Sequence, residues 1–443
     1  MTATTIFAPA TARGRAGVAV IRVSGPAAGA ALVALTGSQP PARRARRARL
    51  THPQSGDALD DGLVLWFPGP GSFTGEDVAE FQTHGGTAVI AAMLEALSRV
   101  PDLRPAEPGE FSRRAFLNGR MDLTEAEAIA DLVNAETEVQ RRQALRQADG
   151  ALARLYDGWR DRCKRLLAHL EAVIDFPDED LPPEVDAAVR EGIATLSTEI
   201  AAHLDDRHRG ERLRDGVHVA VVGVPNAGKS SLVNRLARRE AAIVSAMAGT
   251  TRDVVEVHMD LGGYPLVVAD TAGLRETDDL VEAEGVRRAR ARMESADLTL
   301  HVIDGTTVGQ GPDGLDGPTG PGVIRVYTKI DLIAVDALDQ VRREGAFPLS
   351  TVTGEGLGDL EAALEDRARI LLDGDGGPAL TRQRHRTALE EARSALDQSL
   401  IAPLPELAAE DLRMAMRAIG RVTGRVDVDE LLDVIFRDFC IGK

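Results

Sequence analysis

The sequence predicts a multidomain protein of mixed α+β and α/β class. An N-terminal α+β domain is expected to precede an all-α domain that carries an inserted α/β domain with a parallel sheet. Residues 1–118 mix short apolar strands with one helical run, whereas 119–214 and 373–443 repeat apolar residues at helical spacing. Residues 215–372 alternate near-continuous apolar strands with helices. Two helical blocks that flank an α/β unit indicate that this unit is inserted into one helical domain.

Composition and charge limit the classes to which the chain can belong. Hydrophobic residues make up 44% of the 443 residues, which is enough for several cores, and two cysteines argue against a disulfide framework. The net charge of −17 disfavours broad, non-specific attraction to nucleic acid. The sequence has neither the pattern of a signal peptide nor a run of about 20 apolar residues that would span a membrane. We therefore expect a cytoplasmic protein without membrane association.

The N-terminal domain is expected to combine strands with a helix. GVAVIRVSG at 17–25 and DGLVLWFPG at 61–69 are short and apolar, as strands are, whereas GTAVIAAMLEALSRV at 86–100 has helical periodicity. The stretch ARRARRAR at 42–49 holds five arginines in eight residues. We interpret it as a solvated surface loop. The alternative, a loop that contacts RNA, has no interleaved aromatic residues to support it.

The helical blocks carry a start signal and one of the two cysteines. Thr124 is followed three residues later by Glu127, the pattern of a capping box, and apolar residues at helical spacing come next. Cys163 lies inside a helical pattern, where a buried structural thiol is expected rather than a reactive one.

The strongest motif lies in the α/β domain, whose strands HVAVVG, PLVVAD, LTLHVID and VIRVYT are expected to form a parallel sheet. GVPNAGKS at 223–230 fits G-x-x-x-x-G-K-[ST] and lies between the first strand and a helical run. In such a loop, backbone N–H groups and the positive end of the helix dipole surround phosphate oxygens. Lys229 is placed to reach the β- and γ-phosphates, and the Ser230 hydroxyl to ligate Mg²⁺.

Three further motifs follow in chain order. Asp270 of DTAG ends a strand and can hold Mg²⁺ through water, while Gly273 offers its N–H to the γ-phosphate, and Thr251 of GTTRD can complete the Mg²⁺ shell. Asp331 of TKID can accept two hydrogen bonds from guanine N1–H and its 2-amino group, which adenine cannot supply. The segment LSTVTGEG at 349–356 can close over the base. Together these motifs predict a guanine-nucleotide-binding domain.

The motifs depart from the usual pattern of GTPases in three places. Thr328 stands where the guanine motif begins with asparagine, so we expect lower affinity, with specificity retained through Asp331. Ser350 and Thr351 replace a Ser-Ala pair, whose backbone contact to the base does not need the side chain. Leu274 occupies the position at which many small GTPases have a glutamine that orients water.

Phosphoryl transfer still needs positive charge where negative charge develops, and the motifs contain no evident arginine finger. Asn226 in the phosphate loop can ligate a monovalent cation at that place, with backbone carbonyls of SAMAGT at 245–250 completing the shell. The residues predicted to contact GTP are Asn226, Ala227, Gly228, Lys229, Ser230, Ser231, Ser245, Ala246, Met247, Ala248, Gly249, Thr250, Thr251, Asp270, Thr271, Ala272, Gly273, Thr328, Lys329, Asp331, Ser350 and Thr351.

These residues resemble the MnmE (TrmE) family of tRNA modification GTPases, within the TrmE-Era-EngA-like class. The resemblance rests on GVPNAGKSS, AGTTRD, DTAGLRET, TKID and the terminal CIGK. It extends through SFTGEDVAEFQTHGG at 72–86, RPAEPGEFSRRAFLNGRMDLTEAEAIADL at 104–132 and IDFPDED at 174–180, which separate this family from other GTPases.

The resemblance implies a tetrahydrofolate-binding and dimerisation domain at the N-terminus, a helical domain, and a Ras-like P-loop GTPase domain inserted into it. It implies a homodimer that pairs with an FAD-dependent MnmG-type protein in a heterotetramer or larger complex. The two proteins would add a carboxymethylaminomethyl or aminomethyl group to C5 of the wobble uridine of certain tRNAs. The implied cofactors are GTP, Mg²⁺, K⁺ and 5-formyl- or methylene-tetrahydrofolate.

The resemblance also implies roles for single residues in the GTPase domain. Asn226 matches an asparagine that coordinates K⁺, and Ser245, Met247 and Thr250 match the loop that completes the coordination. Glu282 matches the glutamate that orients the attacking water. Outside the GTPase domain, the implied folate-binding residues are Arg22, Glu80, Arg120 and Lys443.

Cys440 belongs to the terminal Cys-x-Gly-Lys motif, which the resemblance places near the folate site. A thiol there can act as nucleophile or acid–base partner beside a one-carbon unit. Two alternatives are a prenylation signal, for which the final lysine is atypical, and a frayed terminus with an incidental thiol.

Two other functions are weighed for the whole chain. A ribosome-assembly GTPase would need an RNA-binding module, such as a KH domain, after the GTPase unit, and the sequence after residue 372 shows none. A folate-binding switch would use the nucleotide cycle only to control partner binding. The sequence does not separate such a switch from direct catalysis.

Overall fold

The computed structural model describes residues 4–12, 14–175, 183–238, 242–243, 256–270, 296–308, 320–374, 377–426, 429–437, 439 and 442. The chain divides into two compact units. Met1–Ala130, Gln147–Ile193 and Ser394–Lys443 form the first unit, and Asp131–Arg146 and Ala194–Arg393 form the second. Among the described residues, no helix is both long and apolar enough to cross a membrane.

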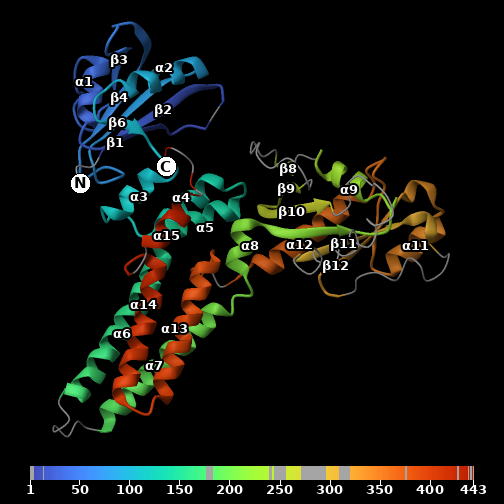
Figure 1. The fold of residues 1–443 in the computed structure, drawn as a ribbon. Helices are drawn as coiled ribbons and strands as arrows, with labels where there is room; N and C mark the ends of the chain where they lie inside the picture. Colours follow the sequence, from blue (N-terminus) through green and yellow to red (C-terminus); the bar gives the residue numbers. More distant parts are fainter. Residues whose placement is uncertain are drawn as a thin grey trace, which may run out of the picture. The chain divides into compact units, whose positions relative to one another are not determined.

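The first unit contains a six-stranded sheet with the strand order β3-β4-β5-β2-β1-β6 (Figure 1). All neighbouring strands are antiparallel except β1 and β6, which are parallel. The strands are β1 Thr5–Pro9, β2 Ala16–Ser24, β3 Arg46–Thr51, β4 Ala58–Phe67, β5 Val78–Gly85 and β6 Leu103–Pro105. Helices α1 (Ala28–Thr36) and α2 (Thr87–Ser98) contribute to one hydrophobic core with this sheet. This confirms the expected α+β arrangement.

Long helices make up the rest of the first unit and extend into the second. They are α3 Glu110–Leu117, α4 Leu123–Asn134, α6 Ala151–Asp175, α7 Pro183–Leu204, α13 Gln383–Ile401, α14 Pro405–Thr423 and α15 Asp429–Arg437. Helix α6 packs along α14. Cys163 of α6 is fully buried, and burial raises the pKa of its thiol to about 12. It is therefore the structural, unreactive thiol expected from the sequence.

The capping box of α4 lies two residues earlier than predicted. Asp122 Oδ1 accepts a hydrogen bond from the Glu125 backbone N–H at 2.9 Å, and Glu125 Oε2 accepts one from the Asp122 N–H at 2.8 Å. Thr124 donates its hydroxyl to the same Asp122 oxygen. The prediction of a box formed by Thr124 and Glu127 is wrong because Asp122 is also a good cap and precedes the helix directly.

The arginine-rich stretch is also not simply a loop. Its second half forms strand β3 at one edge of the sheet, paired with β4 from Arg46 opposite Val64 to Thr51 opposite Ala58. Alternation explains the difference, because Ala48 and Leu50 pack against the core while the intervening arginines do not.

The second unit contains a seven-stranded sheet with the order β13-β12-β11-β7-β10-β9-β8. The strands are β7 Val217–Val222, β8 Ala242–Ile243, β9 Glu256–Leu261, β10 Tyr264–Asp270, β11 Leu298–Asp304, β12 Val323–Thr328 and β13 Phe347–Pro348. From β13 to β10 all neighbours are parallel, and only β9 and β8 are antiparallel additions. The expected parallel sheet is confirmed.

Helices accompany this sheet, as expected of an α/β fold. They are α5 Glu138–Ala148, α8 Arg209–Asp215, α9 Lys229–Leu236, α11 Val335–Arg343 and α12 Leu357–Leu372, with short 3₁₀ turns η1 Gly305–Thr307 and η3 Ile330–Leu332. Because the parallel strands share one direction, the residues that follow β7, β10, β11 and β12 gather at one edge of the sheet. In open α/β sheets, ligands bind at this carboxyl edge.

Candidate functional site

The phosphate loop joins the end of β7 to the start of α9. Gly223 follows the strand with φ +152°, and a Cβ atom there would lie 2.1 Å from the Val302 carbonyl oxygen of β11. Glycine is therefore needed for close packing between the loop and the sheet. Gly228 (φ +94°) precedes Lys229, the first residue of α9, so the loop leads directly into the N-terminus of a helix. This is the geometry that binds phosphate.

Lys229 and Asn226 occupy special positions in this loop. The Lys229 Nζ atom lies 2.9 Å from the carbonyl oxygens of both Gly223 and Val224, so the side chain folds back over the loop. Asn226 has φ +62°, a left-handed conformation that asparagine adopts more readily than most residues. Its side chain is exposed, as are the hydroxyls of Ser230 and Ser231 at the start of α9.

Thr328 connects the phosphate loop to the guanine motif. It is 1% exposed, and its Oγ1 atom lies 2.6 Å from the Ala227 carbonyl oxygen and 3.2 Å from that of Ile303. A threonine hydroxyl has one proton to donate. That proton is directed at the protein backbone, so this side chain has no second donor for a base. The hydroxyl retained at this position thus supports the loop.

Asp331 is positioned by its neighbours in the guanine motif. Ser350 donates its hydroxyl to Asp331 Oδ1 at 2.6 Å, so two predicted base-binding segments are in direct contact. Lys329 has φ +57° and precedes the turn η3, which contains Asp331. Its Nζ forms an ion pair with Asp304 at the end of β11. Burial raises the pKa of Asp304, but hydrogen bonds from Lys329 and Thr306 outweigh this and lower it below the ordinary value.

Several predicted nucleotide residues lie outside the described part of the chain. They are Ser245, Ala246, Met247, Ala248, Gly249, Thr250, Thr251, Thr271, Ala272, Gly273, Leu274 and Glu282. Of Asp270, the backbone is described, as the last residue of β10, and the side chain is not. The described geometry therefore covers the phosphate loop and the guanine motif, and the Mg²⁺, K⁺ and water-orienting assignments in the other segments stay predictions.

In the first unit, the structure brings together two of the predicted folate residues. Arg22 on β2 lies opposite Glu80 on β5, and the two side chains form an ion pair at 2.9 Å. The Arg22 guanidinium also lies 5.2 Å from the Phe73 ring centre and 5.9 Å from that of Phe111. Two aromatic rings around a half-buried ion pair form a mixed surface with hydrogen-bonding capacity.

Arg120 is near this surface through the loop after Phe73. A Cβ atom on Gly75 would lie 3.1 Å from Cγ of Arg120, so the arginine stem packs against that loop. Lys443 and Cys440 lie outside the described residues. Their neighbours are packed: Phe439 is 8% exposed in a cluster with Phe436, and a Cβ atom on Gly442 would meet the Pro9 carbonyl oxygen. At Phe439 and Gly442 the tail is docked rather than frayed.

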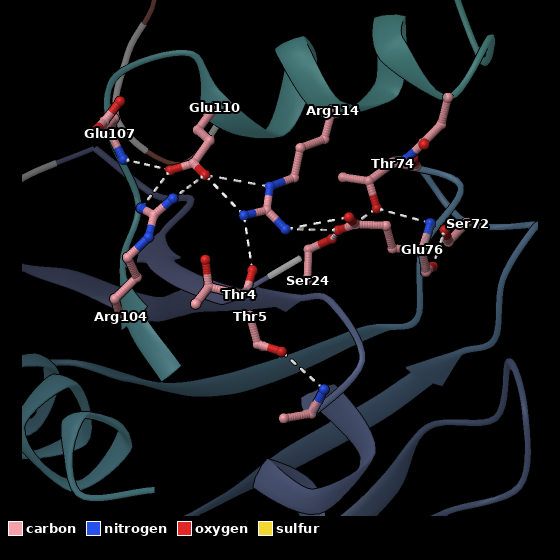
Figure 2. Close-up of polar contacts among 12 residues, drawn as sticks. Thr4, Thr5, Ser24, Ser72, Thr74, Glu76, Arg104, Glu107, Glu110 and Arg114 are labelled. Carbon is pink, nitrogen blue, oxygen red and sulfur yellow. Dashed lines mark hydrogen bonds and ion pairs between the residues drawn. The ribbon is translucent and has the colours of Figure 1, made fainter. Parts of the chain in front are cut away.

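Sequence reasoning assigned no role to a charged network that supports this surface (Figure 2). Arg114 of α3 lies between two carboxylates, 3.1 Å from Glu76 and 2.8 Å from Glu110. Arg104 of β6 donates two hydrogen bonds to Glu110, at 2.6 and 2.8 Å. Ser24 of β2 donates to Glu76 at 2.7 Å. The network ties the 72–76 loop to α3, and these two segments carry Phe73 and Phe111.

Glu110 provides a test of this network. Burial raises the pKa of Glu110, but hydrogen bonds from Arg104, the Glu107 backbone N–H and Arg114 outweigh burial and lower it. The carboxylate therefore stabilises the fold fully above its unfolded pKa of about 4.3, and this contribution is lost as pH falls through the lowered folded value. We expect Glu110→Gln to destabilise the N-terminal domain at pH 7 by about 1–3 kcal/mol, and the difference from wild type to shrink below about pH 4.

The measurement is urea unfolding at both pH values in a Trp159→Phe background, where Trp66 of the N-terminal core is the sole tryptophan. Glu107→Gln is the matched control, because Glu107 is exposed and three residues away. A difference between Glu110→Gln and wild type that is unchanged at low pH would contradict the assignment.

Together these observations define the class of the protein: a P-loop protein of α/β fold with a guanine motif, joined to an α+β and a helical part. Two family models match: the MnmE helical domain over residues 123–440 and the N-terminus of the GTP-binding protein TrmE over residues 5–120. The chain is 69% identical to the tRNA modification GTPase MnmE of Rhodospirillum rubrum, with 100% of both chains covered. It is 56% identical to the proteins of the same name from Paramagnetospirillum magneticum and Parvibaculum lavamentivorans, with at least 99% of each chain covered.

The chain therefore belongs to the MnmE (TrmE) family of tRNA modification GTPases. The family resemblance inferred from the sequence motifs is confirmed. Family membership also disfavours the alternative of a ribosome-assembly GTPase.

Proposed function

We propose that this protein is a potassium-activated GTPase that acts, with an FAD-dependent MnmG-type partner, in adding a carboxymethylaminomethyl or aminomethyl group to C5 of the wobble uridine of certain tRNAs. The observation that carries the proposal is its similarity, from end to end, to tRNA modification GTPases. The phosphate loop between β7 and α9 supports it, because the loop has the backbone geometry that nucleotide binding requires.

In nucleotide hydrolysis, Lys229 neutralises charge on the β- and γ-phosphates and Asp331 selects guanine. Ser230 and Thr251 would hold Mg²⁺, which supplies further positive charge at the phosphates. The exposed Ser230 hydroxyl at the start of α9 fits that role. Glu282 orients the attacking water.

In the N-terminal domain, Arg22, Glu80, Arg120 and Lys443 bind a tetrahydrofolate that supplies a one-carbon unit. The aromatic rings around the Arg22–Glu80 pair fit a ligand that has both a flat ring and charged groups. Cys440 acts near that unit as nucleophile or acid–base partner. The protein works in the cytoplasm as a homodimer, in a heterotetramer or larger complex with its partner.

Potassium activation is tested by GTP hydrolysis in KCl and in NaCl at equal ionic strength. We expect hydrolysis to be about 10-fold or more faster in KCl, since a cation in the place of an arginine finger stabilises transition-state charge. Asn226→Gly removes the amide oxygen but keeps the left-handed backbone accessible, so the variant should lose the preference for K⁺. Equal rates of the wild type in both salts would contradict potassium activation.

A further inference from the structure

The edge strand β3 and the residues before it carry a row of five arginines, here called the arginine edge: Arg43, Arg44, Arg46, Arg47 and Arg49. Strand β3 pairs only with β4 and ends the sheet on that side (Figure 1). The row therefore lies on a rigid element.

The register of β3 directs its arginines to different faces. Leu50 is fully buried, and Ala48 packs against the same core under α1 and α2. Because side chains alternate along a strand, Arg47 and Arg49 lie on the opposite face, about 7 Å apart from a rise of about 3.4 Å per residue. Both are exposed, as is Arg44 just before the strand. This gives regularly spaced guanidinium groups in solvent.

The charges of the arginine edge are poorly compensated. Arg43 and Arg46 donate to neutral oxygens, those of Gly71 and Ser38, both at 2.6 Å. Among the described residues, no ion pair joins Arg44, Arg47 or Arg49 to a carboxylate, although Asp61 lies opposite Arg49 in the ladder. Surface arginines elsewhere commonly pair, as in Arg99–Glu95, Arg141–Glu138 and Arg413–Glu410. A positive surface of this kind stands out in a chain with a net charge of −17.

Protection of the sheet edge is a simpler reading of these arginines. Charged side chains on an edge strand hinder pairing with another chain. Edge protection, however, concerns residues of the strand, and Arg43 and Arg44 precede it. A row of guanidinium groups without carboxylate partners instead matches the phosphates of a nucleic-acid backbone, which guanidinium binds through paired N–H donors.

We propose that the arginine edge is a contact surface for the phosphate backbone of RNA, and specifically of the tRNA substrate. The inference rests on the proposed function, since it takes tRNA as the substrate. Phosphate contacts orient a nucleic acid without reading its bases, so the arginine edge contributes affinity and position rather than selection among tRNAs.

The test uses the full chain with Arg44, Arg47 and Arg49 all replaced by glutamine. The probe is an unmodified tRNA transcript with uridine at the wobble position, and binding is measured by filter retention from low to physiological KCl. The matched control replaces Arg141, Arg142 and Arg146 of α5 by glutamine, which removes three exposed arginines elsewhere.

Each lost phosphate contact lowers the slope of log K against log salt by about 0.7–0.9. We therefore expect the edge variant to lose about 2 from the slope and to bind about 10-fold or more weakly at low salt. The control variant should keep the wild-type slope, and GTP hydrolysis should be unchanged in both.

Three results would overturn the inference. Wild-type affinity and slope in the edge variant would show that the arginines do not touch RNA. An equal loss in the control would show that net charge alone matters. Self-association of the edge variant with unchanged RNA affinity would assign the arginines to edge protection. The proposed function fails separately, when deletion of the gene leaves tRNA wobble uridines unchanged.

Discussion

Replacing Asp331 with asparagine is expected to weaken GTP binding by about 100-fold or more, because a buried or clamped hydrogen-bond pattern to a base discriminates strongly. The carboxylate accepts two hydrogen bonds from guanine, and Ser350 holds one of its oxygens at 2.6 Å. The asparagine amide would face the guanine 2-amino group with a donor of its own. Xanthosine triphosphate carries an oxygen there, so its binding should improve in the same variant.

Affinity is measured by titration with GTP and with xanthosine triphosphate. Asp336→Asn is the control, because Asp336 is exposed in the first turn of α11 and the substitution changes the charge equally. If Asp331→Asn bound GTP like the wild type, the assignment of guanine recognition to this motif would be wrong.

Lys229→Met is expected to lower the rate of GTP hydrolysis by at least about 100-fold, since electrostatic stabilisation of the transferred phosphoryl group is the main catalytic term. Methionine retains most of the side-chain volume but removes the ammonium group. The Nζ atom already lies over the loop, 2.9 Å from the Gly223 and Val224 carbonyl oxygens. A small movement therefore suffices to reach a phosphate bound there.

The assay is phosphate release at saturating GTP. Lys164→Met, on the exposed surface of α6, removes an equal charge and should leave the rate unchanged. Hydrolysis by Lys229→Met within a few-fold of wild type would remove this loop from the catalytic account.

The features predicted correctly from the sequence depend on local patterns. Apolar runs predicted the strands of the parallel sheet, and the spacing from Gly223 to Ser230 predicted a phosphate loop between a strand and a helix. These signals are strong because each is complete within a few residues. Cys163 could be judged in the same way, from the helical periodicity around it.

The features that sequence reasoning missed depend on contacts between distant residues. The partner of Thr328 is Ala227, 101 positions away, and Arg114 reaches Glu76 across 38 positions. No local pattern announces such pairs. The capping box was misplaced by two residues because Asp122 and Thr124 are both plausible caps. The arginine-rich strand was taken for a loop because charge there obscured the apolar alternation of Ala48 and Leu50.

The most direct test of the account is mass spectrometry of nucleosides from the tRNA of a strain that lacks this gene, complemented with wild type, Lys229→Met or Cys440→Ser. We predict that the wobble-uridine modification is absent from the deletion strain and returns with wild type but not with Lys229→Met. Its absence with Cys440→Ser as well would support chemistry by the tail thiol, and its full return would contradict that role. An unchanged modification level in the deletion strain would contradict the central claim that this protein acts in tRNA modification.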